Sequence, residues 1–170
     1  YNAEGIKAIA DAIARSSLTV ADLRFNQLDT ESATMLANIA KEKKISLCGI
    51  TPEQTVADLK RKHDRYGPFM TPADAILLTA DLAIRSSLMV ADLRYNNLDT
   101  KTATMLANIA KEKKMSLCGI TPEQTEADFR GNDEINDYHS MGPVDAILLT
   151  ADLSVRGSLT ECYLCWNGFG

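Results

Sequence analysis

The sequence predicts an α/β protein built from stacked repeats, with parallel strands on the inside and helices on the outside. Three observations lead to this fold class: a long internal duplication, short segments in which apolar and polar residues alternate, and apolar residues at helical spacing behind capping residues. One strand and one helix cannot bury their apolar faces alone, so such units must stack on their neighbours. We expect a right-handed solenoid of about five units.

The duplication has an offset of 70 residues. Residues 17–55 return as residues 87–125, and only six of the 39 aligned positions differ. Residues 73–88 return as residues 144–159, and a shorter phrase, VADLR or a variant of it, recurs every 34–36 residues. The basic unit is therefore about half of the long repeat. We expect a single array with units near residues 1–17, 18–53, 54–87, 88–123, 124–158 and 159–170.

Each unit is expected to open with a short strand. Two apolar residues, Ala21 and Leu23, alternate with two charged residues, a period of two that is typical of a half-buried strand. The polar side chain of Asn26 is placed to bond backbone groups where the chain turns away from the strand. The same spacing recurs in residues 88–98 and 159–169.

A helix is expected after each strand. Asp29 and Thr30 are capping residues, and lysine-rich residues 41–44 carry the positive charge that favours a helix C-terminus. Between them, apolar side chains recur at helical spacing, namely Ala33, Leu36, Ile39 and Ala40. A second kind of helix begins at Thr71, because a cap, a proline at the first position and an acid at Asp74 form a start signal.

Two segments compete to be the second inner strand of each block. Residues 45–50 (ISLCGI) fit the strand pattern and begin 27 residues after Leu18. Residues 56–60 (VADLK) fit it as well, and we favour them because they carry an acidic and a basic residue like residues 22 and 24. The copy of residues 45–50 at 115–120 raises the same alternative.

The pattern L-x-x-L-x-L-x-x-N-x-L of these strands resembles the leucine-rich repeats of the ribonuclease-inhibitor type. The resemblance covers nearly the whole chain and implies a horseshoe that binds proteins through its curved surface. The phrases SLCGITPEQTEADF and DAILLTADL also look like repeat proteins of unicellular algae. Two departures are a repeat longer than the 20–29 residues usual in the family and a lysine, Lys62, where the turn asparagine should stand.

The strand residues that point away from the core are candidates for partner binding. If neighbouring strands stack in register, their acidic residues form one column and their basic residues form the next. This surface either grips a partner or only neutralises itself, since an exposed pair contributes about 0–1 kcal/mol. The column residues are Asp22, Asp58, Asp92 and Asp128, then Arg24, Lys60, Arg94 and Arg130, with Tyr163 breaking the acidic column in the last unit.

An aromatic residue occupies one strand-end position in three units: Phe25, Tyr95 and Trp166. Such a row either anchors a protein partner or covers the corner between strand and helix. Cys162 and Cys165 form a lone C-x-x-C, and residues three apart on a strand face opposite sides, so no shared metal is expected.

The remaining side chains predict no catalytic, cofactor or metal site. Cys48, Cys118 and Cys162 are interpreted as small core residues, and His63 and His139 as loop residues in contact with solvent. No phosphate-binding loop or nucleophile–base motif is present in the sequence.

Composition limits the classes of function. The formal net charge is −5, with no basic block, so we expect no nucleic-acid partner. We expect no transmembrane helix, because no segment of the sequence is long and apolar enough, and no signal peptide, because the first residues have neither a basic start nor an apolar core. Cysteines that are not spaced as a disulfide framework favour a reducing intracellular compartment, either the cytoplasm or an organelle.

We therefore expect a non-enzymatic protein-interaction or scaffold module. One alternative is a structural accessory subunit of a large assembly, for example in an algal organelle. Such a subunit would co-purify with its partners in a fixed ratio. Another is a regulatory module for a GTPase, although no exposed arginine loop of the needed kind is evident. Because neither end has a polar cap, we also expect a fragment of a longer array or ends that partners cover.

Overall fold

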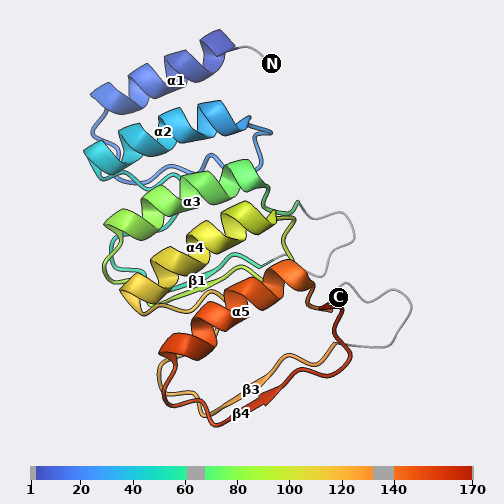
Figure 1. The fold of residues 1–170 in the computed structure, drawn as a ribbon. Helices are drawn as coiled ribbons and strands as arrows, with labels where there is room; N and C mark the ends of the chain where they lie inside the picture. The colour runs from blue at the N-terminus through green and yellow to red at the C-terminus, as the bar shows by residue number, and fades with distance from the viewer. Residues whose placement is uncertain (1–2, 61–67, 132–139, 170) are drawn as a thin grey trace. The chain divides into compact units, whose positions relative to one another are not determined.

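The computed structural model describes residues 3–60, 68–131 and 140–169. Within these ranges the chain is mixed α/β, with five helices and two pairs of short parallel strands (Figure 1). It divides into two compact units. The first unit comprises Tyr1–Gln54 and Met70–Ser87, and the second comprises Thr55–Phe69 and Leu88–Gly170.

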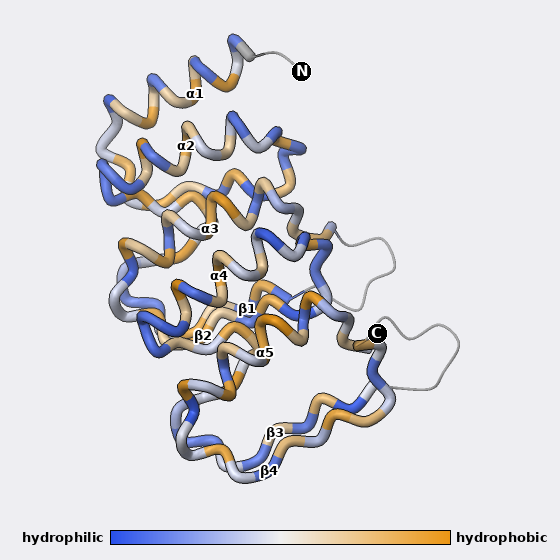
Figure 2. Tube along the Cα trace, viewed as in Figure 1, coloured by the Kyte–Doolittle hydropathy of each residue, from blue (hydrophilic) through white to orange (hydrophobic). Residues whose placement is uncertain are grey.

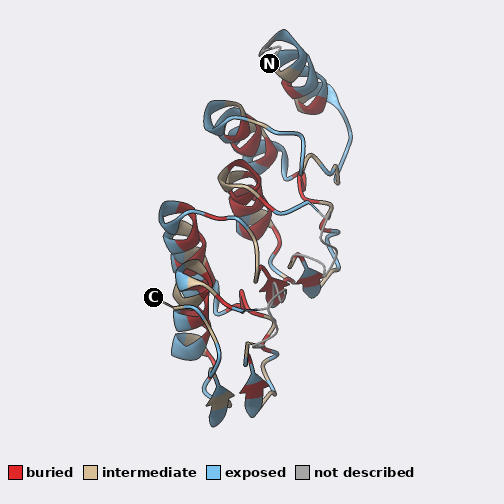
Figure 3. Cartoon of the chain, turned by 90° about the vertical axis from the view of Figure 1, so that its right-hand side faces the viewer, coloured by how far each residue is buried: buried red, intermediate tan, exposed pale blue. Residues whose placement is uncertain are grey.

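Three helices form one layer of the first unit: α1 (Ala3–Arg15), α2 (Thr30–Lys43) and α3 (Pro72–Ile84). Helix α2 packs against both α1 and α3. One side of the helix, which carries Ala33, Leu36, Ala37 and Ala40, is buried, while the opposite side is exposed (Figure 3). Helix α3 is more apolar along its length (Figure 2), and nine of its residues are buried.

The predicted helix signals are confirmed at both ends of α2. The Asp29 carboxylate accepts the N–H of Ser32 at 2.7 Å, which satisfies a backbone donor that the first helical turn leaves free. The helix ends at Lys44, whose φ of 58° is left-handed and lets its N–H return to the carbonyl groups of Ala40 and Lys41. Of the four predicted core positions, Ala33, Leu36 and Ala40 are buried and Ile39 is half-buried.

Helix α3 starts with the predicted capping box. The Asp74 N–H donates to Thr71 Oγ1 at 3.3 Å, and the Thr71 N–H donates to Asp74 Oδ2 at 2.9 Å. The second oxygen of Asp74 accepts the N–H of Phe25 at 2.9 Å, so this one side chain joins the helix start to the turn that follows residues 20–24.

The strand-like part of the first unit consists of isolated bridges, a parallel one described below and an antiparallel one between Asp22 and Cys48. Val20 pairs with Ser46. The N–H groups of Ala21 and Leu23 donate to the carbonyl groups of Ser46 and Leu47 at 2.8 and 2.9 Å. Residues 20–23 and 46–47 therefore lie side by side and are joined through α2, as a parallel pair requires.

The second unit contains the named strands. Its elements are β1 (Val56–Asp58), β2 (Val90–Asp92), α4 (Thr100–Lys113), β3 (Glu126–Asp128), α5 (Pro143–Val155) and β4 (Glu161–Tyr163). Strand β1 pairs with β2 in parallel, Val56 opposite Val90, and β3 pairs with β4, Glu126 opposite Glu161. Helix α4 repeats the caps of α2, with Asp99 at its start and Lys114, φ 55°, at its end.

Both candidate second strands pair with a VADLR segment. One edge of β2 pairs with β1, and Val90 bridges Ser116 on the other edge. The N–H groups of Ala91 and Leu93 donate to the carbonyl groups of Ser116 and Leu117 at 2.8 and 2.9 Å. The favoured VADLK segment is confirmed as a strand, β1, whereas residues 45–50 and 115–120 form isolated bridges. The two segments were not exclusive alternatives, because β2 has one edge for each kind of neighbour.

The predicted strand alternation is confirmed on its apolar side. Ala91 and Leu93 are fully buried. Asp92 was expected to point outward into solvent, yet its side chain is only 8% exposed. Because β2 has a neighbour on each edge, both flanking segments shield this carboxylate.

Candidate functional site

The charged strand residues pair mainly within their own segment. Arg24 donates from Nε to Asp22 Oδ1 at 2.9 Å and from Nη2 to Asp22 Oδ2 at 2.5 Å. This two-bond geometry suits a planar guanidinium and a carboxylate. The corresponding distances are 2.9 and 2.7 Å from Arg94 to Asp92, and 2.9 and 2.5 Å from Arg130 to Asp128.

Lys60 contacts two carboxylates. Its Nζ lies 3.9 Å from Asp58 Oδ2 and 3.7 Å from Asp92 Oδ2. Asp58 and Asp92 are register partners, so the expected acidic column exists at this point of the second unit. The acidic column does not continue directly from Asp92 to Asp128. The segment of Ser116 lies on the other edge of β2, and the register partner of Asp128 is Tyr163.

The ion pairs shift the acidity of their carboxyl groups. Hydrogen bonds from Arg130 lower the pKa of Asp128 from 3.8 to about 2. Hydrogen bonding by Arg24 likewise lowers the pKa of Asp22. Both carboxylates stay charged near neutral pH, and each is matched by its own arginine, so these strand ends are locally neutral.

Each of the three arginines also stacks on an aromatic ring. The Arg24 guanidinium carbon lies 5.4 Å from the centre of the Phe25 ring. The other stacking distances are 5.5 Å from Arg94 to Tyr95, 5.0 Å from Arg94 to Phe129, and 5.4 Å from Arg130 to Tyr163. These distances are within the range of cation–π attraction, which holds each guanidinium in a defined orientation.

The aromatic row shares one backbone conformation. Phe25, Tyr95 and Trp166 all have φ of 65°, a left-handed value that is uncommon for bulky residues. The N–H of Tyr95 donates to Asp145 Oδ1 at 3.0 Å, as that of Phe25 does to Asp74. The row therefore forms the corner between strand and helix, while Phe25 and Trp166 still expose 41% and 66% of their surface.

Arg130, Tyr163 and Trp166 are an arginine and two aromatic residues that are exposed at the strand ends of the second unit, and we call them the strand-end cluster. The Arg130 side chain is 53% exposed, Tyr163 is 40% exposed and Trp166 is 66% exposed. The Tyr163 hydroxyl donates to Glu161 Oε2 at 2.5 Å. Trp166 lies beside Arg130 in the backbone, because the N–H of Gly131 donates to the carbonyl of Cys165 at 3.0 Å.

A buried carboxylate that sequence reasoning missed organises residues 46–48. Asp81 lies in α3 with no exposed surface. It accepts the Ser46 hydroxyl at 2.5 Å, the Leu47 N–H at 2.7 Å and the Cys48 N–H at 3.0 Å. Burial raises the pKa of Asp81, against the effect of these donors.

The second block repeats this arrangement. Asp152 in α5 accepts the hydroxyl of Ser116 and the N–H groups of Leu117 and Cys118, the latter two at 2.6 and 2.9 Å. The signal was present in the sequence as an acidic residue inside an apolar helix.

Two buried arginines bind backbone carbonyl groups near these carboxylates. Arg85 donates to the carbonyl of Ile50 at 3.0 Å and to that of Thr19 at 2.9 Å. Arg156 donates to the carbonyl of Met89 at 3.0 Å. Each arginine thus ties its helix to the segment preceding a VADLR strand, and both side chains serve packing rather than an exposed site.

Glycine is required where residues 115–120 pass the ion pair of β2. Gly119 has φ of 81°, which favours glycine, and a Cβ there would lie 2.8 Å from Asp92 Oδ2. Gly49 has φ of 74° and a Cβ would lie 3.3 Å from Asp22 Oδ2.

Two of the three cysteines that were expected in the core, Cys48 and Cys118, are there, and Cys162 is not. Cys48 and Cys118 are buried, and burial raises the pKa of each thiol well above 9.0. Cys162 is half-buried and Cys165 is exposed. His63, His139 and Lys62 lie outside the described residues. Within residues 3–60, 68–131 and 140–169, no group of three or more His, Cys, Asp or Glu is placed to hold a metal ion.

Comparison with known proteins adds no family assignment. Among the helices of the described chain, none has the length and apolar character needed to cross a membrane. No protein-family model matches the sequence, and no curated protein matches it significantly.

Proposed function

We propose that this chain is a leucine-rich-repeat module of the ribonuclease-inhibitor type that binds a protein partner and has no catalytic activity of its own. The turn asparagines support stacking of repeat units. Asn96 donates to the carbonyl of Leu93 in its own segment and to that of Leu59 in the neighbouring one, both at 2.9 Å. Asn167 donates in the same way to Leu164 at 3.0 Å and to Phe129 at 2.7 Å.

The strand-end cluster carries the proposal that the partner is a protein. Arginine, tyrosine and tryptophan dominate the energetic centres of protein interfaces. The Arg130 side chain is already oriented by Asp128 and by the Tyr163 ring, so it loses little freedom when a partner binds. Trp166 offers the largest exposed apolar side chain of the row.

The local neutrality of the strand ends limits how a partner is recognised. Each arginine is matched by a carboxylate in its own segment, so long-range attraction to one sign of charge is weak. We expect apolar and aromatic contacts to dominate, and the affinity to change little as salt concentration rises.

The test starts from the native particle. Gel filtration of a gentle extract, followed by mass spectrometry, identifies proteins that co-elute with the chain, and binding is then measured with the purified partner. A partner in fixed ratio indicates the structural-subunit form of the proposal, and an exchanging partner indicates the regulatory form.

The strand-end cluster is then tested by substitution. Trp166→Ala and Tyr163→Ala should each weaken binding about tenfold or more. Leu153→Ala is the matched control, because Leu153 is 44% exposed on α5 of the same unit and belongs to no strand end. Equal affinity for all three variants, or no co-eluting partner at any salt concentration, would contradict the proposal.

A further inference from the structure

Helices α2 and α4 both end in a lysine-rich turn, and we call residues 41–44 and 111–114 the lysine turns. Each has the sequence Lys-Glu-Lys-Lys, and all of its residues are exposed. Three lysines and one glutamate make each turn positive, in a chain whose net charge is −5. One lysine turn belongs to each of the two compact units.

The last lysine of each turn stands where many helices end in glycine. Lys44 has φ of 58° and ψ of 39°, and Lys114 has φ of 55° and ψ of 37°. Both conformations are left-handed, which glycine adopts freely and a residue with a Cβ adopts at a steric cost. Both units therefore hold a lysine in a strained conformation that glycine would occupy more easily.

Contacts within the fold do not account for these ammonium groups. Among the residues that the structure describes, Lys41, Lys43 and Lys44 form no ion pair or side-chain hydrogen bond, and the same holds for Lys111 and Lys114. The helix dipole favours a positive charge in the last turn, but it does not require a strained residue there. The side chains at the two left-handed positions therefore have no structural role in these contacts.

The lysines of one turn also repel one another. Lys41 and Lys44 are three residues apart, a spacing that places side chains side by side at a helix surface, where like charges destabilise the helix. Strained backbone often persists where a side chain serves binding rather than stability. Carboxylates of a bound partner would relieve the repulsion, so strain and charge both favour an anionic ligand.

An acidic protein segment fits the lysine turns better than a membrane or a nucleic acid does. A membrane-surface helix needs an exposed apolar face, but the apolar sides of α2 and α4 are buried against their own units. Duplex DNA carries a phosphate about every 1.7 Å, and Glu42 or Glu112 within each turn would repel such a dense charge. A protein segment spaces its carboxylates more widely, so it can match lysines that a glutamate interrupts.

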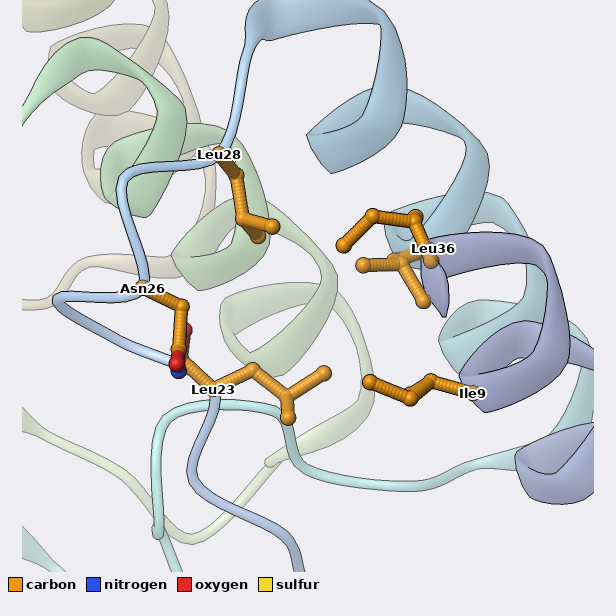
Figure 4. A pocket seen from close by; sticks show the side chains of 6 residues that line it. Ile9, Leu23, Asn26, Leu28 and Leu36 are labelled. Atoms are coloured by element: carbon orange, nitrogen blue, oxygen red, sulfur yellow. The ribbon is translucent and has the colours of Figure 1, made fainter. Parts of the chain in front are cut away.

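The apolar pocket of the first unit is separate from the lysine turn of that unit (Figure 4). Its volume is about 140 Å³, and its lining residues are Ile6, Ile9, Leu23, Asn26, Leu28 and Leu36. None of them is charged. Leu36 precedes Lys43 by seven residues, about 10 Å along α2, so the lysine turn lies away from the pocket and offers charge rather than apolar surface.

We propose that each lysine turn is a docking surface for an acidic segment of a partner protein. The carboxylates of the segment lie against the three ammonium groups of the turn, and the strained lysine supplies one of the three. This proposal rests on the protein-binding function proposed above and adds the chemistry of the partner at a second surface. It uses none of the strand-end cluster, and it predicts a component of binding that salt weakens.

A labelled peptide of eight glutamates tests the proposal on the whole chain by fluorescence anisotropy. The assay starts at about 0.1 M salt, where charges more than about 10 Å apart are largely screened, so the acidic remainder of the chain does not mask binding. Binding should be saturable and should weaken at least about fivefold at roughly 0.5 M salt. A peptide of eight glutamines is the neutral control and should not bind.

A variant that removes both strain and charge locates the site. Lys44→Gly combined with Lys114→Gly should raise the melting temperature, because glycine relieves the left-handed strain, yet weaken peptide binding about threefold or more. Lys7→Gln combined with Lys101→Gln is the matched control. It changes the net charge equally at exposed lysines outside the lysine turns and should leave the affinity unchanged.

Several outcomes would overturn the proposal. They are absence of saturable binding, equal affinity for the two peptides, unchanged affinity of the glycine variant, and a lower melting temperature of that variant. Equal or tighter binding of an eight-residue deoxythymidine oligonucleotide or of phosphatidylserine vesicles would assign the lysine turns to phosphates and would also overturn it. If the peptide fails to bind while a co-eluting partner still loses affinity in Trp166→Ala, only this proposal fails and the proposed function stands.

Discussion

Replacing Asp81 with asparagine should destabilise the first unit by about 1–3 kcal/mol. The substitution keeps the size of the side chain and changes one carboxylate oxygen into an amide group. Asp81 lies in α3 with no exposed surface, and its two oxygens accept three hydrogen bonds from residues 46–48. The perturbation therefore acts on hydrogen bonding rather than on packing.

The magnitude follows from the groups left without an acceptor. The asparagine side-chain oxygen can still accept the hydrogen bond from the Leu47 N–H, but the asparagine NH2 group then faces the Cys48 N–H. These two groups are both donors, so they repel each other. Cys48 N–H retains only the Ser46 hydroxyl oxygen at 3.3 Å. A buried donor without a good acceptor costs about 1–3 kcal/mol, and removal of a buried charge offsets part of that cost.

Urea unfolding of the parent and the variant, followed by circular dichroism, measures this loss. Hydrogen exchange at the amides of Leu47 and Cys48 should accelerate in the variant, which locates the effect. Asp11→Asn, at an exposed residue of α1, is the control and should change stability by less than about 0.5 kcal/mol. A loss for Asp81→Asn no larger than that of the control would refute the reasoning.

The same variant tests the sign of the pH dependence. Burial raises the pKa of Asp81 above 3.8, so the native state holds a proton in a range where the unfolded chain has released it. The free energy of unfolding contributed by this group therefore falls as pH rises from 3.8 through the native pKa. Asparagine removes that slope, so the stability difference between parent and variant should shrink as pH rises across this window.

Three further substitutions test other contacts of the structure. Gly119→Ala should destabilise the chain by about 1–3 kcal/mol in thermal or urea unfolding, because the φ of Gly119 is left-handed and a Cβ there meets Asp92 Oδ2. Gly157→Ala is the control and should not destabilise the chain, because nothing lies within 4 Å of a Cβ at that position. Lys114→Gly should stabilise by about 1 kcal/mol, because Lys114 ends α4 at φ 55°, and a loss of stability would contradict this. Arg130→Ala should raise the pKa of Asp128 from about 2 toward 3.8, measured by NMR titration, and an unchanged pKa would show that Arg130 is not the cause.

Local signals in the sequence determined most of the secondary structure. The capping residues Asp29 and Thr71 mark the starts of α2 and α3, and the lysine-rich segment after residue 40 marks the end of α2. The inward positions Ala91 and Leu93 follow from alternation alone. These features depend on residues within a few positions of one another, so they are readable without knowledge of the fold.

Sequence reasoning was less successful where partners are distant in the chain. The roles of Asp81 and Asp152 escaped it, because each carboxylate meets residues about 35 positions earlier. The favoured residues 56–60 do contain a strand, but treating residues 45–50 as its alternative missed that both kinds of segment pair with a VADLR segment. The charged columns and the aromatic row were found as positions, but their pairing within a segment and their stacking on arginine were not.

The two VADLR segments show most directly what the sequence determined and what the tertiary structure decided. Both copies have the same ion pair and the same turn, but residues 90–92 form strand β2 whereas Val20 and Asp22 form isolated bridges. Only the tertiary structure gives Leu93 full burial and leaves Leu23 half-buried beside a pocket. Burial depends on which segment lies alongside, and that neighbour is a property of the assembled fold rather than of the local sequence.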